Sequence, residues 1–395
     1  MEVQRSTEVK KAFMTGDDAV AHAARQSRVD LVAAYPITPQ TIIVERIADF
    51  AASGEFDGEF VPVESEHSAM SACIGGALAG ARVFTATASQ GLALMHEMLY
   101  AASGLRLPMV MAVANRALNS PLNIHNDHSD IMGSRDSGWI LLFAENAEEA
   151  YDRVIQAFRI SEAVNLPVAV NMDGFTLTHS AEVVRMLSDE AAGTFVGRPP
   201  RRSTMLDKVP KSFGMMSLPD TYQYFKDDQL RAVDASPAAI SSVEREYAGI
   251  SGRNYGPVKS LHAEDADVVM VMLGSYAGTA RAAVEPLRAE GLKVGVLSLG
   301  WYRPFPSGEL LRAVERASTL VVMDRSVSHG APMHPLASDV AAALYRAGAR
   351  KRILSVVYGL GGRWFTEDDA RALFRYASKP GPDFESFFYY GGEMR

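Results

Sequence analysis

The sequence predicts an α/β fold: a doubly wound parallel sheet, followed by a second α/β unit. Short apolar runs, typical of buried strands, alternate with helical segments up to about residue 178. This alternation is typical of a parallel sheet that is covered by helices. It stops after about residue 180 and resumes near residue 266. We therefore expect an α/β domain over residues 1–180, a connecting arm over residues 181–260, and a second α/β domain over residues 261–395.

Length and charge limit the class of protein. A chain of 395 residues is too long for one typical domain. With 48% hydrophobic and 22% charged residues, its composition is that of an ordinary globular protein. The net charge of −8 argues against binding to nucleic acid or to an anionic membrane. Because no long apolar span and no secretion signal are recognisable, we expect a cytoplasmic protein with no nucleic-acid or membrane partner.

The sequence has a single cysteine, Cys73, and this excludes two kinds of chemistry. One thiol cannot form an intramolecular disulfide, and it cannot supply the cysteine ligands of an iron–sulfur cluster. Cys73 lies in a helix-like run of small residues, Met70 to Ala77. We therefore expect a buried, inert thiol there.

The first domain is expected to begin with an Ala-rich helix over residues 14–26. A short β-type run over residues 28–34 follows, and then the segment AAYPITPQT, residues 33–41. The two prolines that flank Thr38 disfavour helical backbone at the residue before each of them. We therefore expect helix only after Pro39, with Thr38 as its cap. This makes a strand–turn–helix corner at the carboxyl end of a strand, where open α/β sheets bind ligands, although most such turns bind nothing.

The rest of the first domain consists of further expected strands, each followed by a helix or a turn. One helix is expected to begin near Ser65, in a segment rich in glycine and alanine, and another to run from Leu94 to Ser103. One strand is apolar throughout, as in a parallel strand that is buried on both faces. The expected strands are residues 59–64, 82–88, 108–114, 140–143 and 167–172.

The arm is rich in turns, and the second domain repeats the alternation. Residues 198–202 and 217–220 have the proline content of turns, while the stretch after Asp227 favours a helix. The second domain is expected to begin with an apolar strand over residues 266–275. Its further expected strands are residues 293–298, 320–324 and 353–359.

Two charged residues stand at expected strand ends on the same edge as the corner. Glu66 opens the helix of small residues; it is either a capping group or a buried acid that contacts a ligand nitrogen. Arg116 ends an apolar strand at the edge that carries Thr38. Its guanidinium is either solvated or binds a carboxylate, because the planar arrangement of its donors matches the two carboxylate oxygens.

Other polar clusters are weaker signals. The segment from His125 to Asp130 contains two histidines and two aspartates, but it lacks the spacing of a metal site, so no metal is expected. Two glycine-rich turns, over residues 274–279 and 359–363, are candidates for holding a phosphate at a helix start. Neither has the spacing of a nucleotide-binding loop.

Several motifs, in one order along the chain, resemble those of a known family. They are residues 34–39 (AYPITP), 64–69 (ESEHSA), 87–92 (TASQGL), 114–118 (ANRAL), 126–130 (NDHSD), 135–139 (RDSGW), 302–306 (YRPFP) and 359–363 (GLGGR). The chain resembles the α subunit of 2-oxoacid:ferredoxin oxidoreductases, the pyruvate synthase group. The resemblance covers nearly the whole chain and is weakest over residues 185–255.

The resemblance implies thiamine diphosphate chemistry: oxidative decarboxylation of a 2-oxoacid to acyl-CoA, with coenzyme A as co-substrate. It implies that the first domain binds the pyrimidine half of the cofactor and that the second is similar to the carboxy-terminal domain of transketolase. Glu66 matches the glutamate that contacts the aminopyrimidine ring, and Pro36 matches a residue that lines it. Thr38 and Arg116 match the pair that binds the 2-oxoacid.

The resemblance also implies that this chain is only one part of an enzyme. The family's Gly-Asp-Gly motif with a downstream Asn, which holds a divalent metal and the diphosphate, is not found in the sequence. A β subunit is therefore expected to hold Mg and the diphosphate half of the cofactor. The γ and ferredoxin-like δ subunits, or their equivalents, are expected to carry 4Fe–4S clusters, with ferredoxin or another acceptor taking the electrons.

The substrate stays open on the sequence. Pyruvate is the expected 2-oxoacid, and a branched-chain or aryl 2-oxoacid such as phenylglyoxylate is the alternative. The loop over residues 119–127 follows Arg116 and carries His125 where many relatives have Trp. Two other classes also stay open: a non-catalytic α/β scaffold, and a thiamine-dependent synthase that uses no clusters.

Overall fold

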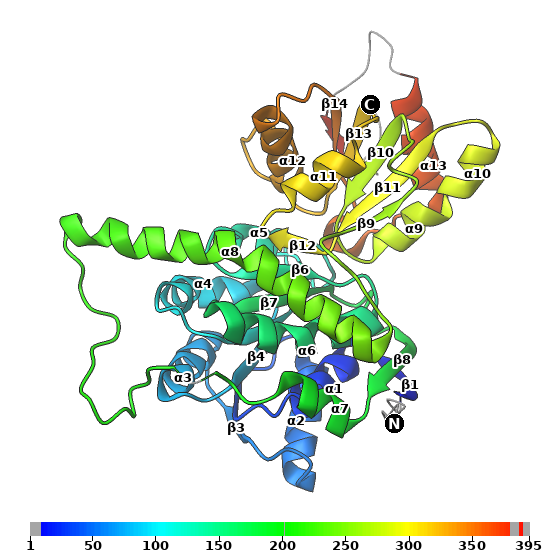
Figure 1. Ribbon diagram of the computed structural model, residues 1–395. Coiled ribbons are helices and arrows are strands. Elements are labelled where there is room, and N and C mark those ends of the chain that lie inside the picture. The colour runs from blue at the N-terminus through cyan, green and yellow to red at the C-terminus, as the bar shows by residue number, and fades with distance from the viewer. Residues whose placement is uncertain (1–8, 201, 380–386, 390–395) are drawn as a thin grey trace, which may run out of the picture.

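The computed structural model describes residues 9–200, 202–379 and 387–389. Within these ranges the chain forms two mainly parallel sheets and a two-stranded antiparallel ribbon (Figure 1). Helices lie against both parallel sheets, so the predicted doubly wound α/β class is confirmed. Among the described helices, none has both the length and the apolarity that crossing a membrane requires.

The first parallel sheet has seven strands in the order β12-β6-β7-β5-β4-β2-β3, and only β12 runs antiparallel to its neighbour. From β2 the chain moves outward to β3 and then returns to β4 on the other side of β2. The carboxyl ends of β2 and β4 therefore flank a topological switch point, where α/β sheets bind ligands. The strands are β2 Leu31–Ala34, β3 Glu59–Pro62, β4 Val83–Thr87, β5 Val110–Asn115, β6 Ile140–Phe143, β7 Val168–Asp173 and β12 Trp301–Arg303.

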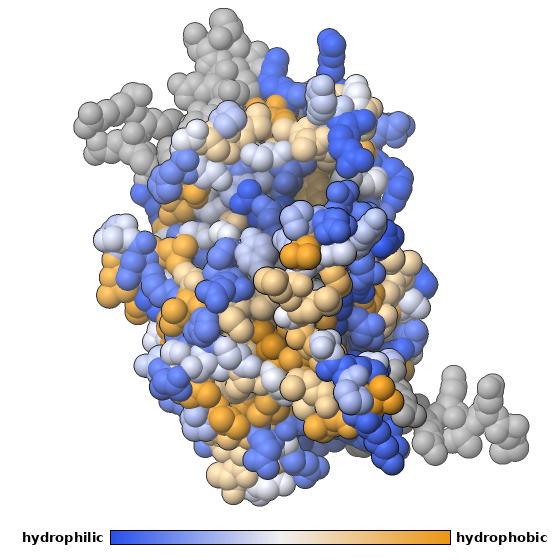
Figure 2. All heavy atoms as spheres, turned by 90° about the vertical axis from the view of Figure 1, so that its left-hand side faces the viewer, coloured by the Kyte–Doolittle hydropathy of each residue, from blue (hydrophilic) through white to orange (hydrophobic). Residues whose placement is uncertain are grey.

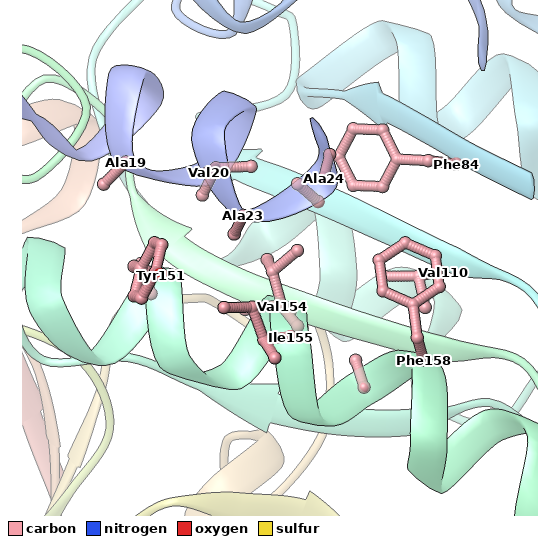
Figure 3. Close-up of a cluster of buried hydrophobic side chains, with 14 of the residues drawn as sticks. Ala19, Val20, Ala23, Ala24, Phe84, Val110, Tyr151, Val154, Ile155 and Phe158 are labelled. Atoms are coloured by element: carbon pink, nitrogen blue, oxygen red, sulfur yellow. The ribbon is translucent and has the colours of Figure 1, made fainter. Parts of the chain in front are cut away.

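Helices cover both faces of this sheet because its central strands are apolar on both sides. In β5, Val110 and Ala112 pack with α1, α2 and α6, while Met111 and Val113 pack with α3 and α4. Figure 3 shows small α1 side chains such as Ala23 facing the α6 side chains on the first of these two layers. The helices are α1 Gly16–Gln26, α2 Thr41–Ser53, α3 Glu66–Ala79, α4 Ser89–Gly104, α5 Ser129–Ser134 and α6 Ala147–Val164.

Three helix starts differ from the sequence prediction. Helix α1 begins at Gly16 and not at residue 14, because Val9–Thr15 form strand β1, which pairs with β8. Helix α4 begins at Ser89, five residues before the predicted Leu94. The expectation that Thr38 caps α2 is wrong: the capping position is Gln40, whose side-chain amide donates instead to the Tyr35 carbonyl at 2.8 Å. The segment between the two prolines is therefore a turn of its own.

The second parallel sheet has six strands in the order β15-β14-β13-β10-β11-β9, with β9 antiparallel. Strand β12 follows β11 directly but joins the first sheet, where Trp301 pairs with Leu142 of β6. The strands are β9 Val258–Leu261, β10 Val268–Met272, β11 Val294–Leu299, β13 Thr319–Asp324, β14 Arg352–Val357 and β15 Phe387–Tyr389. The helices are α9 Tyr276–Ala282, α10 Val284–Ala289, α11 Ser307–Ala313, α12 Pro335–Arg346, the 3-10 turn Leu360–Gly362 and α13 Glu367–Ser378.

Along the chain, the segment that connects the two domains contains β8 Ala181–Leu187, α7 Asp189–Val196 and the long α8 Pro219–Ser251. The carboxy-terminal half of α8 packs on α6, whereas no residue from Pro219 to Ala235 is buried, and this end projects from the body (Figure 1). Figure 2 views the molecule from the projecting side and shows hydrophobic residues scattered among hydrophilic ones. Over residues 205–230, the exposed large apolar side chains are Met205, Leu206, Val209, Met215, Met216, Leu218, Tyr222, Tyr224, Phe225 and Leu230.

Candidate functional site

The residues singled out from the sequence lie at the carboxyl edge of the first sheet, beside the switch point. Thr38 is exposed in the turn after β2, and Glu66 is buried at the first position of the helix after β3. Arg116 follows the last residue of β5. Parallel strands end at one edge of a sheet. The hydroxyl of Thr38, the carboxylate of Glu66 and the guanidinium of Arg116 therefore lie at the same edge, although they are distant in sequence.

Arg116 is held against the corner by two backbone carbonyls. Its Nη1 donates to the carbonyl of Thr38 at 2.9 Å, and its Nε donates to the carbonyl of Asn123 at 3.1 Å. Burial lowers the pKa of the Arg116 guanidinium, and the charge of Asp130 opposes this shift. Within the described residues, Nη2 of Arg116 and the hydroxyl of Thr38 make no hydrogen bond. These donors are oriented by the protein and remain available to a ligand.

Glu66 is a buried acid and not the cap of its helix. The capping position is Ser65, whose hydroxyl accepts from the amide of Ser68 at 3.2 Å. The Glu66 residue is only 6% exposed, yet its carboxylate makes no hydrogen bond to another described residue. The Glu66 oxygens are not among the fully enclosed polar atoms that lack a partner, so they keep some exposure and can accept a hydrogen bond from a ligand. Because Ser65 caps the helix, the ligand-binding interpretation of Glu66 stays a prediction.

Gly91 and Thr87 complete the surroundings of this carboxylate. A Cβ built on Gly91 would lie 2.6 Å from Oε1 of Glu66 and 2.5 Å from Oγ1 of Thr87. Only glycine fits there without displacing one of the two side chains. The Thr87 hydroxyl is fully buried and has no hydrogen-bond partner among the described residues. A carboxylate acceptor and an unused hydroxyl therefore lie together at the carboxyl end of β4.

Pro36 is exposed in the same turn as Thr38. The neighbouring Ile37 packs against the core, which anchors the turn. Pro36 thus presents an apolar ring at the edge of the sheet.

Sequence reasoning missed Asp130, because it treated residues 125–130 as a polar loop. Asp130 is 3% exposed and accepts four hydrogen bonds. Two come from the backbone amides of Ser89 and Arg116, each at 3.0 Å. Burial raises the pKa of the Asp130 carboxyl to about 6, although the Arg116 amide opposes the shift. The sequence signal for this role is absent, because the donors come from the ends of two different strands.

The glycine-rich turns considered as phosphate sites are already filled by side chains of the first sheet. Asp173, at the end of β7, accepts from the amide of Ser275 at 2.8 Å and from Arg325 at 3.0 Å. Burial alone would raise the pKa of Asp173, but the Arg325 guanidinium outweighs this and holds it below its usual range. In the second turn, the carbonyl of Gly361 accepts from the Asn123 side chain at 3.0 Å. Both turns are therefore engaged by contacts that connect the second domain to the first.

Two further sequence expectations concern reactive or ligating groups. The structure confirms that Cys73 is buried, and burial raises the pKa of its thiol to about 12, so it is not a nucleophile at neutral pH. His125 and His128 point to different neighbours: His125 lies beside Phe175, with ring centroids 4.8 Å apart, while Nε2 of His128 contacts Asp173 at 2.8 Å. In the described part of the chain, no group of three or more His, Cys, Asp or Glu side chains is arranged to hold a metal ion.

Comparison with known proteins places this chain in one class. A family model described as pyruvate flavodoxin/ferredoxin oxidoreductase, thiamine diphosphate-binding, matches residues 22–245. A second, pyruvate:ferredoxin oxidoreductase core domain II, matches residues 266–370. The first sheet is therefore the thiamine diphosphate-binding domain of this class of oxidoreductase.

Relatives with similar sequences extend over almost the whole chain. Pyruvate synthase subunit PorA of Thermotoga maritima is 48% identical over 93% of this chain and 95% of that protein. Ketoisovalerate oxidoreductase subunit VorA of Pyrococcus abyssi is 44% identical over 92% of each chain. The chain belongs to the α-subunit family of the 2-oxoacid:ferredoxin oxidoreductases, in the pyruvate synthase group, and is a subunit of an oxidoreductase.

Two solved structures share the fold at low sequence identity. One is a 2-oxoglutarate:ferredoxin oxidoreductase from Magnetococcus marinus with 2-oxoglutarate, coenzyme A and succinyl-CoA bound; its TM-score is 0.72 at 21% identity. The match covers 95% of this chain and 66% of that one. The other is a split-gene transketolase, with a TM-score of 0.55 at 15% identity over 93% of this chain and 98% of that one.

Proposed function

We propose that this chain is the α subunit of a thiamine diphosphate-dependent enzyme that oxidatively decarboxylates a 2-oxoacid, pyruvate first, to acyl-CoA and CO2. Electrons pass to iron–sulfur clusters on partner chains and then to ferredoxin or another acceptor. The observation that carries the proposal is Glu66, a buried residue whose carboxylate has no partner in the described part of the chain and lies at the switch point of a thiamine diphosphate-binding domain.

The residues around Glu66 fit the pyrimidine half of this cofactor. The carboxylate and the unused Thr87 hydroxyl lie beside Gly91, where a side chain would fill the space. When bound, the cofactor supplies the carbon nucleophile that attacks the 2-oxoacid. Glu66 would accept a hydrogen bond from a ring nitrogen of the cofactor. Pro36 presents its ring at the same edge and lines the cofactor.

Arg116 and Thr38 fit the 2-oxoacid. Backbone carbonyls use two of the five guanidinium donors of Arg116, and both Nη2 donors remain. A guanidinium that is fixed in this way binds a carboxylate with little loss of side-chain entropy. The Thr38 hydroxyl stands on the turn whose carbonyl orients Arg116, so the two groups hold the substrate together. Their combined role is to orient the carboxylate and carbonyl of the 2-oxoacid.

The segments that carry these residues also present exposed apolar side chains. Tyr35 is 39% exposed, Leu94 50%, Leu122 69% and Ile124 40%. An apolar surface around a polar site is typical of a subunit interface. The proposed occupant is a β subunit, which brings Mg and the diphosphate half of the cofactor. Subunits with 4Fe–4S clusters, and coenzyme A as co-substrate, complete the enzyme.

The substrate proposal rests on the relatives and on one contact. His125 packs against Phe175 at 4.8 Å between ring centroids, and its backbone amide is fixed by the Asn123 side chain at 2.7 Å. The loop after Arg116 is thus anchored, and pyruvate is the first candidate because a pyruvate synthase subunit is 48% identical to this chain. A branched-chain 2-oxoacid is the second candidate, because ketoisovalerate oxidoreductase subunits are 44% identical to this chain.

The experiment is a substrate panel with the purified, complete enzyme. Dye reduction that depends on coenzyme A is measured with pyruvate, 2-oxoisovalerate, 2-oxoglutarate and phenylglyoxylate, with and without added thiamine diphosphate. We expect the highest kcat/KM for pyruvate and no reduction after the cofactor has been removed. If kcat/KM were higher for 2-oxoisovalerate than for pyruvate, a branched-chain 2-oxoacid would replace pyruvate as the proposed substrate. A cofactor-loaded enzyme that oxidises no 2-oxoacid would contradict the proposed function.

A further inference from the structure

Asp130 connects the two halves of the proposed site through the backbone. Its Oδ2 accepts from the amide of Ser89 at 3.0 Å and from the amide of Arg116 at 3.0 Å. Its Oδ1 accepts from the side-chain amide of Asn115 at 3.0 Å and from the amide of Ile131 at 2.7 Å. Each carboxylate oxygen therefore accepts from two donors, and three of the four donors lie at or directly after the carboxyl ends of β4 and β5.

The turns after β4 and β5 carry the groups that face the cofactor and the substrate. Ser89 begins α4, and Gly91, two residues later, packs directly against the Glu66 carboxylate. Arg116 presents its guanidinium from the other turn. The Ser89 hydroxyl makes a second link, since it donates to the carbonyl of Ala117 at 2.5 Å. The pairing of β4 with β5 sets the spacing of the two strands as far as Thr87 and Val113, and these buried contacts tie the two turns together beyond the strand ends.

We propose that Asp130, assisted by the hydroxyl of Ser89, is a positioning residue. It fixes the position of Gly91, which packs against Glu66, relative to the position of Arg116. This inference rests on the proposed function, because it assigns Glu66 to the cofactor and Arg116 to the 2-oxoacid. Asp130 acts through Ser89, Gly91 and Arg116 and contacts no substrate itself. Its negative charge also stabilises the protonated Arg116 guanidinium.

The carboxylate is required because only donors converge on it. Asparagine has nearly the same shape but carries one oxygen and one NH2 group. In Asp130→Asn, the NH2 group meets either the amides of Ser89 and Arg116 or the donors of Asn115 and Ile131, so each orientation loses two of the four hydrogen bonds and loosens the hold of residue 130 on the turns. A displacement of about 1 Å in a reacting group costs about 100-fold in rate. We expect Ser89→Ala, which removes only the second link, to act in the same direction and more weakly.

The test compares Asp130→Asn with Asp324→Asn in the complete enzyme. Asp324 is a matched control, because it is also a buried carboxylate that accepts two backbone amides, from Leu336 at 2.8 Å and Ala337 at 3.1 Å, but it belongs to the second sheet. We expect Asp130→Asn to lower kcat/KM for the 2-oxoacid by about 100-fold, while KM for coenzyme A stays within about twofold. Asp324→Asn is expected to keep both constants.

The outcomes separate this inference from the proposed function. A wild-type enzyme that oxidises no 2-oxoacid would contradict the proposed function itself. An active wild-type enzyme with unchanged 2-oxoacid kinetics in Asp130→Asn would overturn only the positioning role, as would equal losses in Asp130→Asn and Asp324→Asn. If Asp130→Asn does not assemble, the kinetics of Ser89→Ala test the inference instead. A raised KM for the 2-oxoacid with an unchanged KM for coenzyme A would support the positioning role. Wild-type kinetics in Ser89→Ala would refute it.

Discussion

Gly91→Ala is a small change that the structure predicts to have a large effect on activity. Gly91 is the third residue of α4, and its backbone is not in the left-handed region. On helix propensity alone, alanine should stabilise this position by about 1 kcal/mol. The new methyl group would nevertheless lie 2.6 Å from Oε1 of Glu66 and 2.5 Å from Oγ1 of Thr87.

The size of the effect follows from these contacts. Ordinary van der Waals contact begins at 3.4 Å, so the Glu66 carboxylate must retreat by about 0.8 Å. Thr87 lies in a fully buried strand, so it is the less able of the two to move. A displacement of about 1 Å at a reacting group costs about 100-fold in rate. We therefore expect turnover of the 2-oxoacid to fall by about two orders of magnitude.

The assay is 2-oxoacid-dependent dye reduction by the complete enzyme, together with thermal unfolding of each variant. Gly75→Ala is the matched control, because Gly75 is an exposed glycine of α3, the helix that Glu66 opens, and a Cβ there would meet nothing within 4 Å. It should show a similar gain in helix propensity with unchanged turnover. If Gly91→Ala folds, assembles and turns over within threefold of wild type, Glu66 does not have the role assigned to it.

Three further predictions concern single groups. Glu66→Gln should assemble normally and lose about 10²–10⁴ in turnover, since it removes a positioned acid; near-normal turnover would exclude the role. Arg116→Lys should raise KM for the 2-oxoacid and lower turnover, because a point charge replaces an oriented fork of donors. Thr38→Val should have a weaker effect in the same direction. If Arg116→Lys changed only the affinity for thiamine diphosphate, Arg116 would bind the cofactor and not the 2-oxoacid. Burial raises the pKa of Asp324 to about 7, above its value in the unfolded chain, so the folded state takes up a proton as the pH falls through 7. Relative to Asp324→Asn, wild type should therefore gain roughly 1 kcal/mol of stability between pH 8 and pH 6, and parallel unfolding profiles would contradict this.

The sequence was sufficient where each local signal pointed to the same structure. The apolar run over residues 108–114 predicted a strand buried on both faces, and β5 Val110–Asn115 packs against helices on both sides. Glu66 and Arg116 were recognisable because each charged residue directly follows a predicted strand. Strand ends meet at one edge of a parallel sheet, so their convergence follows from the fold class alone.

What the sequence did not reveal depends on contacts between distant segments. Strand β1 exists because it pairs with β8, whose residues lie more than 160 positions away. Thr38 had the composition of a helix cap, but Pro39 and Gln40 extend the turn and α2 starts at Thr41. Asp130 is indistinguishable from a loop aspartate until the amides of Ser89 and Arg116 are seen to converge on it.

The central claim is that this chain supplies one half of an active site. The direct measurement is calorimetric titration of thiamine diphosphate with Mg²⁺ into the isolated chain and into the chain combined with its partner subunits, alongside iron content and dye reduction. We expect the isolated chain to be colourless and free of iron, to bind the cofactor poorly and to oxidise no 2-oxoacid, and the assembled enzyme to gain all these properties. Stoichiometric iron or 2-oxoacid-dependent dye reduction in the isolated chain would contradict the account.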